Sequence, residues 1–328
     1  MHLSAQLENP WNEFDPEGEG VTEYYAAVDG VKLPALRKAC EKEEKYKLHF
    51  ELLPEPFVGD PTRAAFVVLT TNPGFSEPAG ETSAPIKASD KESFTDPVIE
   101  NIILHNLRNE NDREMYWANP RCRTAICEDG KRRLTSPYVW YFGREDAELA
   151  QKYGYPGETG KSPRLAYLHQ ALSYLGPLED LKNASESAAN PKDFAKNIDK
   201  KDKSAWDSER GFDLIRTHVA IVDLIPYHSV EASPSINYDL PTKEYTRELV
   251  LQALNNKAYI MIGRRHEGWS RLVPELFDAE KNHGRVFTCG SGQNVSFTPN
   301  NTYKMDKGIV KEKDPEFFWQ TVQHILET

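Results

Sequence analysis

The sequence predicts an α/β protein, with a three-layer α/β/α fold around a central four-stranded parallel sheet and insertions at the N-terminus and in mid-chain. Two observations predict it. An apolar run at residues 66–69 ends abruptly in Thr-Thr-Asn-Pro-Gly, which is typical of a strand buried on both faces. The back half of the chain alternates strand and helix three times, which implies parallel strands joined by right-handed crossovers.

Composition places the 328-residue chain among globular proteins. Hydrophobic residues make up 39% of it and charged residues 28%. No run of 18 apolar residues is present, so we expect no membrane span. The N-terminus lacks a basic region followed by an apolar stretch, so we expect no secretion signal and a cytoplasmic protein. The sequence does not indicate an oligomeric state.

Cysteine spacing and net charge limit the cofactors and partners. Cys122 and Cys127 are separated by four residues, and no histidine cluster accompanies them, so reduced thiols are the simpler interpretation and no cofactor is expected. The net charge of −11 disfavours a dedicated duplex-binding protein, because phosphate neutralisation dominates such binding, but it leaves a local basic groove open.

The first strand divides the chain into two expected parts. Residues 1–60 are interpreted as a peripheral N-terminal segment. Residues 61–328 are interpreted as a single α/β domain that carries a helical or loop insertion around residues 100–211. The strand at residues 66–71 is followed by a polar loop to residue 95, and apolar residues at helical spacing predict a helix over residues 96–110.

The insertion contains three recognisable stretches. The aromatic cluster YVWYF, residues 138–142, is either a core strand or a wall that stacks on a flat ligand. A helix is predicted over residues 162–176, with Ser162 as N-cap and Pro163 at the first helical position. Residues 178–211 are polar and of mixed charge, which is typical of a surface excursion.

Strands and helices then alternate to the end of the chain. Apolar runs with sharp ends predict strands at residues 218–226, 257–263 and 284–290. Helices are predicted at residues 241–256 and 268–278, and a closing helix begins with Asp314 as N-cap and Pro315 at the first helical position.

In such a sheet the carboxyl ends of the strands meet at one edge, where ligands bind. Asn72 lies there and offers two donors and an acceptor, although Asn-Pro-Gly is also a common turn sequence. Polar and aromatic side chains that can hold a nucleobase and its phosphates follow all four strands, at residues 72–75, 223–229, 263–266 and 290–296. His228 and His266 are among them, each either a structural or a functional histidine.

These strand ends carry a resemblance to a known family. VVLTTNPGF, VAIVDLIPY, YIMIGRRHEGW and CGSGQNVSFTPNN resemble, in order, the four motifs of the uracil-DNA glycosylase superfamily. The similarity is greatest to its single-strand-selective and mismatch-specific branches, and it covers roughly residues 64–90 and 212–302. The resemblance implies a DNA-repair hydrolase that cleaves the N-glycosidic bond of a damaged or modified base, with a nucleic acid or nucleotide as partner and the base flipped into a pocket at the strand ends.

The resemblance also implies roles for individual residues. Asn72 would position the attacking water, and Gln293 or Asn294 would help the base to depart. Apart from the resemblance, Arg264 and Arg265 follow a strand and precede a predicted helix, so we expect one of them to contact phosphate and the other to lie on the surface. A second group would bind the base, with Phe75 stacking on it: Thr71, Pro73, Gly74, Phe75, Asp223, Tyr227 and Ser291. Phe297 would be a wedge between bases, or would simply pack in the core.

Three positions depart from the family pattern. Thr70 stands where the first motif has Gly, and Asp223 stands where the second strand usually ends in Asn. A carboxylate only accepts hydrogen bonds, so Asp223 would favour cytosine or guanine over uracil. Ser291 begins the stretch that replaces a His-Pro-Ser type of turn.

Two other functions therefore stay open. One is a non-catalytic member of the same fold that binds a nucleotide or nucleic acid. The other is a small-molecule hydrolase or transferase of another α/β type, although the chain contains no G-x-S-x-G elbow, P-loop or G-x-G-x-x-G sequence.

Overall fold

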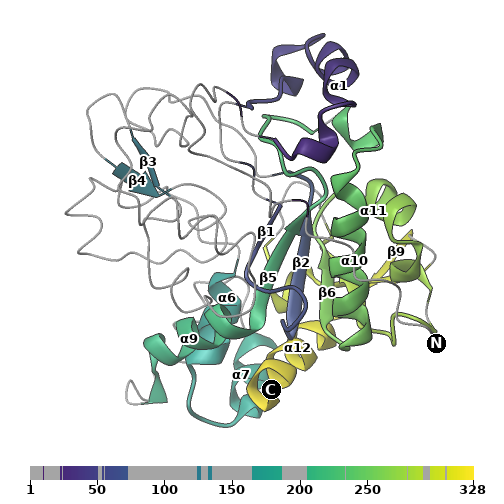
Figure 1. Ribbon diagram of the computed structural model, residues 1–328. Helices are drawn as coiled ribbons and strands as arrows, with labels where there is room; N and C mark the ends of the chain where they lie inside the picture. Colours follow the sequence, from purple (N-terminus) through teal and green to yellow (C-terminus); the bar gives the residue numbers. More distant parts are fainter. Residues whose placement is uncertain are drawn as a thin grey trace.

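A computed structural model gives the arrangement of the chain (Figure 1). It describes residues 10, 23, 25–50, 54, 56–72, 124–126, 132–134, 165–186, 205–232, 234–278, 280–290, 296–306 and 309–328. The helix predicted at residues 96–110, the loop before it and the aromatic cluster at residues 138–142 lie outside these ranges.

A mixed seven-stranded sheet forms the centre of the molecule. Its order is β1 (Phe57–Val58), β5 (Val219–Asp223), β2 (Phe66–Thr70), β6 (Tyr259–Ile262), β7 (Val286–Thr288), β8 (Tyr303–Asp306) and β9 (Ile309–Lys313). The strands β5, β2, β6 and β7 run parallel, whereas β1, β8 and β9 are antiparallel to their neighbours. The α/β class is confirmed, but the sheet is mixed and wider than the predicted one. A separate pair, β3 (Thr124–Ile126) and β4 (Arg132–Leu134), was not predicted.

Helices cover both faces of this sheet (Figure 1). One face carries α6 (Ala166–Ser173), α7 (Leu178–Glu186), α9 (Ser208–His218) and α12 (Glu316–Glu327). The other carries α10 (Thr242–Asn255) and α11 (His266–Leu272). None of the helices in the described ranges is long and apolar enough to cross a membrane.

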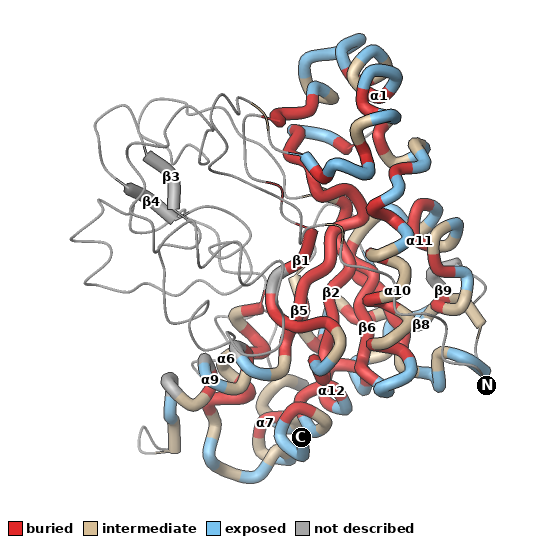
Figure 2. Tube along the Cα trace, in the orientation of Figure 1, coloured by how far each residue is buried: buried red, intermediate tan, exposed pale blue. Residues whose placement is uncertain are grey.

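Strand β2 shows why its sequence is continuously apolar. Phe66 and Val68 face the α6–α12 side, while Val67 and Leu69 face α10 and α11. All four side chains are fully buried, as the red central strands of Figure 2 show. A strand covered on both faces has no solvent side, so it lacks the alternation of an exposed strand.

Helix ends follow the predicted signals in part. The closing helix begins one residue later than predicted, with Pro315 as N-cap, and Oδ1 of Asp314 just before it accepts a hydrogen bond from N of Glu316 at 3.1 Å. The helix predicted over residues 268–278 is instead two pieces, α11 and the short 3₁₀ helix η7 (Pro274–Phe277). Pro274 has no N–H to continue the first helix, so the chain turns there. Residues 178–186, predicted as part of a surface excursion, form helix α7, whose Leu181 is buried.

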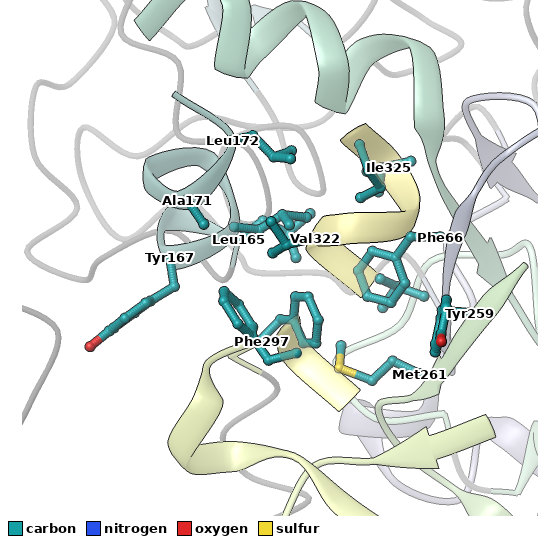
Figure 3. Close-up of a cluster of buried hydrophobic side chains, with 14 of the residues drawn as sticks. Phe66, Leu165, Tyr167, Ala171, Leu172, Tyr259, Met261, Phe297, Val322 and Ile325 are labelled. Carbon is teal, nitrogen blue, oxygen red and sulfur yellow. The ribbon is translucent and has the colours of Figure 1, made fainter. Parts of the chain in front are cut away.

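Phe297 belongs to the core and is not a wedge. Its side chain is fully buried, and its ring lies 4.6 Å from that of Phe66 and 4.7 Å from that of Phe318. Figure 3 shows it among the apolar side chains of α6, α12 and the sheet. A ring held on all sides by other rings is not available to enter a base stack, so the packing interpretation is confirmed.

Residues 25–50 of the N-terminal segment pack beyond the carboxyl end of β5, where Figure 1 shows α1 (Leu33–Cys40) above the sheet. Their apolar side chains form a third buried cluster with three residues that follow β5: Ile225, Tyr227 and Leu240. The backbone N of His49 also donates to the carbonyl of His228 at 2.9 Å. The segment is therefore attached to the edge of the sheet where the predicted site lies.

Candidate functional site

The carboxyl ends of the parallel strands lie level with one another. Thr70 of β2 is paired with Asp223 of β5, and Leu69 is paired with Ile262 of β6. Ile262 is paired in turn with Thr288 of β7. The described residues that directly follow these positions therefore share one edge of the sheet, as the sequence predicted.

Asn72 is held by the loop that follows β5. Its Nδ2 donates to the carbonyl oxygen of Ser229 at 2.8 Å and lies 3.0 Å from Ser229 Oγ. The Ser229 hydroxyl donates in turn to the carbonyl of Glu231 at 3.0 Å. A carbonyl can only accept, so the nitrogen end of the carboxamide must face Ser229. The oxygen Oδ1 therefore points away from Ser229, and it accepts no hydrogen bond from any described residue.

The two departures from the family pattern at the strand ends contact each other. The hydroxyl of Thr70 donates a hydrogen bond to Oδ1 of Asp223 across the β2–β5 pair. Asp223 is almost fully buried, and its backbone N donates to the carbonyl of Pro56 at 3.0 Å. The side chain that would read a base edge is thus engaged in joining the two strands.

Thr71, predicted to bind a base, is a buried residue directly after β2. Its backbone carbonyl accepts from N of Ile225 at 2.8 Å. Its hydroxyl Oγ1 is buried and has no hydrogen-bond partner in the described part of the chain. An unsatisfied buried hydroxyl costs about 1–3 kcal/mol, so a ligand group that reached Thr71 Oγ1 would gain a favourable contact.

Tyr227, also predicted to bind a base, faces the N-terminal segment. Its hydroxyl donates to Oδ2 of Asp29 at 2.6 Å, and its ring lies 4.9 Å from that of Phe50. Burial and the neighbouring Asp29 carboxylate raise the pKa of this phenol well above its ordinary value. Tyr227 therefore anchors the segment through a neutral, hydrogen-bonded side chain.

Asp29 is the centre of that anchor, and no sequence pattern had pointed to it. Its carboxylate also accepts from N and Oγ1 of Thr242, at 3.0 and 2.9 Å, at the start of α10. Burial raises the pKa of Asp29 in spite of these hydrogen bonds. Lys243 next to it donates to two backbone carbonyls, and burial lowers its pKa to about 8.

The two arginines after β6 differ in exposure. Arg265 is exposed, starts α11 and has a left-handed backbone, with φ 57°. Arg264 is half-buried and takes part in interactions within the protein. Arg265, at the start of α11, is thus the more exposed of the two arginines that were considered as phosphate contacts.

His266 is fixed by its neighbour on β7. Its Nε2 lies 2.6 Å from Oγ1 of Thr288, whose hydroxyl donates to the carbonyl of Ile262 at 2.8 Å. The single hydroxyl proton is therefore used, so Nε2 must carry a proton and donate to Thr288. Burial lowers the pKa of His266, which favours the neutral ring. These contacts describe a structural histidine.

The remaining predicted site residues lie outside the described ranges. They are Pro73, Gly74 and Phe75 after Asn72, and Ser291, Gln293 and Asn294 after β7. The described part of the site brings Asn72, Thr71, Thr70 and Asp223 together at adjacent strand ends. It also adds Ser229, which stood among the residues after the second strand without a role. Within the described ranges, no group of three or more His, Cys, Asp or Glu side chains is placed to hold a metal ion.

Comparison with known proteins adds no relative: no family model, curated protein or solved structure matches the chain.

Proposed function

We propose that this chain hydrolyses the N-glycosidic bond of a damaged or modified nucleobase, with Asn72 holding the attacking water. The observation that carries the proposal is the orientation of the Asn72 carboxamide. Its nitrogen is bound to Ser229, so its oxygen is directed away from that loop and can accept a hydrogen bond from water. Its place after β2 also supports the proposal, because open α/β sheets bind ligands at the carboxyl ends of their strands.

The proposed reaction needs orientation more than proton transfer. The water oxygen attacks C1′ of the sugar while the bond from C1′ to the base nitrogen breaks. The electron pair of that bond leaves with the base, and the proton of the water passes to solvent. A neutral carboxamide is a poor base, so Asn72 acts by holding the water in line with the breaking bond.

The departing base carries negative charge, and hydrogen-bond donors lower the energy of that charge. We propose that Gln293 or Asn294 supplies such a donor, as the resemblance to the glycosylase motifs implies. Phe75 would stack on the base, and Arg265, exposed at the start of α11, would contact a phosphate. Thr71 Oγ1, which is buried without a partner among the described residues, would contact the bound base or sugar.

A cleavage assay tests the proposal. Single-stranded and mismatched oligonucleotides that carry uracil or another modified base are incubated with the protein, and abasic sites are revealed by alkaline strand cleavage. We expect abasic sites with the wild type and far fewer with Asn72→Ala. If no substrate in the panel gives abasic product, the proposal is overturned.

A non-catalytic nucleotide-binding role is the second candidate, and the Thr70–Asp223 hydrogen bond favours it. The glycosylase motifs have Gly and Asn at these two positions, whereas here the pair joins the strand ends. Calorimetric titration with uracil, deoxyuridine and nucleoside monophosphates distinguishes the two functions. Saturable binding without any cleavage would support the binding role.

A further inference from the structure

The direction of a carboxamide decides what it offers to a ligand. Turned one way, Asn72 presents an acceptor to bound water; turned the other way, it presents two donors. At the Ser229 side, the carbonyl oxygen accepts only. The Ser229 hydroxyl has given its single proton to the carbonyl of Glu231, so toward Asn72 it also accepts. Both Ser229 groups therefore require the nitrogen of Asn72, and a turned carboxamide would place oxygen against two oxygens.

Ser229 is itself held from outside the sheet. It is fully buried in the loop after β5, and the N-terminal segment forms hydrogen bonds with the chain before and after it. On one side, N of His49 donates to the carbonyl of His228 at 2.9 Å. On the other, N of Glu231 donates to the carbonyl of Lys45 at 2.7 Å, and the side chains of Lys45 and Glu231 form an exposed ion pair at 3.5 Å.

We propose that Ser229 is a positioning residue that sets the direction of the Asn72 carboxamide, and that residues 25–50 of the N-terminal segment hold Ser229 in place. The inference rests on the proposed function, since positioning matters only if Asn72 acts on a ligand. It assigns the N-terminal segment a part in the reaction: residues 45–49 fix the loop, the loop fixes Asn72, and Asn72 fixes the water.

The first test is kinetic and uses Ser229→Ala. The variant keeps the backbone carbonyl that accepts from Asn72 but loses the hydroxyl between Asn72 and Glu231. Loss of one buried hydrogen bond that holds a reacting group predicts a kcat about 5–10-fold lower, with KM within about 2-fold of wild type. Ser235→Ala is the matched control. The Ser235 hydroxyl is also buried and donates to a backbone carbonyl, that of Ala232, and it makes no contact with Asn72. We expect Ser235→Ala to keep the wild-type kcat.

The second test does not depend on catalysis. With ¹⁵N-labelled asparagine, the side-chain NH₂ signals of Asn72 are the pair that disappears in Asn72→Asp. We expect these protons to exchange with solvent about 5–10-fold faster in Ser229→Ala than in wild type, and at the wild-type rate in Ser235→Ala. Unchanged exchange in Ser229→Ala overturns the proposal, whether or not the protein cleaves any substrate.

The two tests separate the possible failures. If the wild type produces no abasic sites, the proposed function fails, and the exchange of the Asn72 protons still decides whether Ser229 directs the carboxamide. If the wild type is active and Ser229→Ala matches it in kcat, the positioning role is overturned while the proposed function stands. A KM effect without a kcat effect likewise overturns it, because a residue that positions the water acts in the transition state.

Discussion

The buried carboxylate of Asp29 joins the N-terminal segment to the sheet. Its hydrogen bonds determine how much the free energy of unfolding falls when the carboxylate is removed. Asp29 accepts from Tyr227 Oη at 2.6 Å and from N and Oγ1 of Thr242 at 3.0 and 2.9 Å. In Asp29→Ala these three buried donors lose their acceptor. An unsatisfied buried donor costs about 1–3 kcal/mol, so three at the low end of that range predict a loss of about 3–5 kcal/mol in the free energy of unfolding.

Urea denaturation measures this loss, with Asp278→Ala as the matched control. Asp278 also accepts hydrogen bonds, from N of Glu280 at 3.0 Å and N of Lys281 at 3.4 Å, but these are exposed. We expect the control to lose less than about 1 kcal/mol, since water replaces an exposed acceptor. Asp29→Asn keeps an acceptor oxygen, so its loss should lie between the two. Equal stability of Asp29→Ala and Asp278→Ala would refute the anchoring role of Asp29.

Three further predictions concern stability. Lys243 has a pKa of about 8 in the folded protein, against an ordinary 10.5, so between these two values the unfolded chain binds more protons than the folded one. The contribution of Lys243 to the free energy of unfolding therefore rises with pH across this window, by up to about 3 kcal/mol. Denaturation curves of wild type and Lys243→Met at several pH values measure this rise. Gly59→Ala should lower the free energy of unfolding by more than about 2 kcal/mol, because the φ of Gly59 is +77° and a Cβ would lie 2.6 Å from the carbonyl oxygen of Val219. Gly284→Ala, with φ +67° and open space around it, should lower it by only about 1 kcal/mol. Equal losses in thermal unfolding would contradict the role of the close contact at Gly59. Phe297→Ala should lose about 3–5 kcal/mol, since the side chain is fully buried among other rings, and a loss under about 1 kcal/mol in urea would contradict its place in the core.

The parallel strands were predictable because their sequences leave little choice. Strands β2, β5 and β6 are buried on both faces, so each is a short apolar run with breakers after it. Once the strands are placed, the level ends of β2 and β5 follow from the geometry of a parallel sheet. The common edge of Asn72, Thr71 and Asp223 was therefore accessible to sequence reasoning.

The antiparallel additions were not predictable in the same way. Strands β8 and β9 contain Lys304, Lys311 and Lys313; β9 is the edge strand of the sheet and β8 is its neighbour. Edge strands often carry lysine to discourage further pairing, and such charged sequences lack the apolar signal of a buried strand. Strand β1, at the opposite edge, has only two residues, which is too short for a sequence pattern to show.

The sequence did not predict the contacts between distant parts of the chain. Asp29 meets Tyr227 and Thr242 across about 200 residues, and Asn72 meets Ser229 across 157. No local pattern encodes such pairs, since each residue is ordinary in its own segment. For the same reason Tyr227 resembled a base-binding residue in the sequence, whereas its partner Asp29 lies in the segment that was interpreted as peripheral.

In the proposed function, the Asn72 carboxamide orients the water that cleaves the glycosidic bond. Single-turnover rates of abasic-site formation on a uracil-containing single strand, for wild type, Asn72→Ala and Asn282→Ala, test it most directly. Asn282 is the matched control because its Nδ2 also donates to a backbone carbonyl, that of Leu276 at 2.9 Å, but it precedes β7 and so lies toward the opposite edge of the sheet. We expect a rate about 100-fold lower for Asn72→Ala and within about 2-fold of wild type for Asn282→Ala. An Asn72→Ala protein that forms abasic sites at the wild-type rate would contradict it.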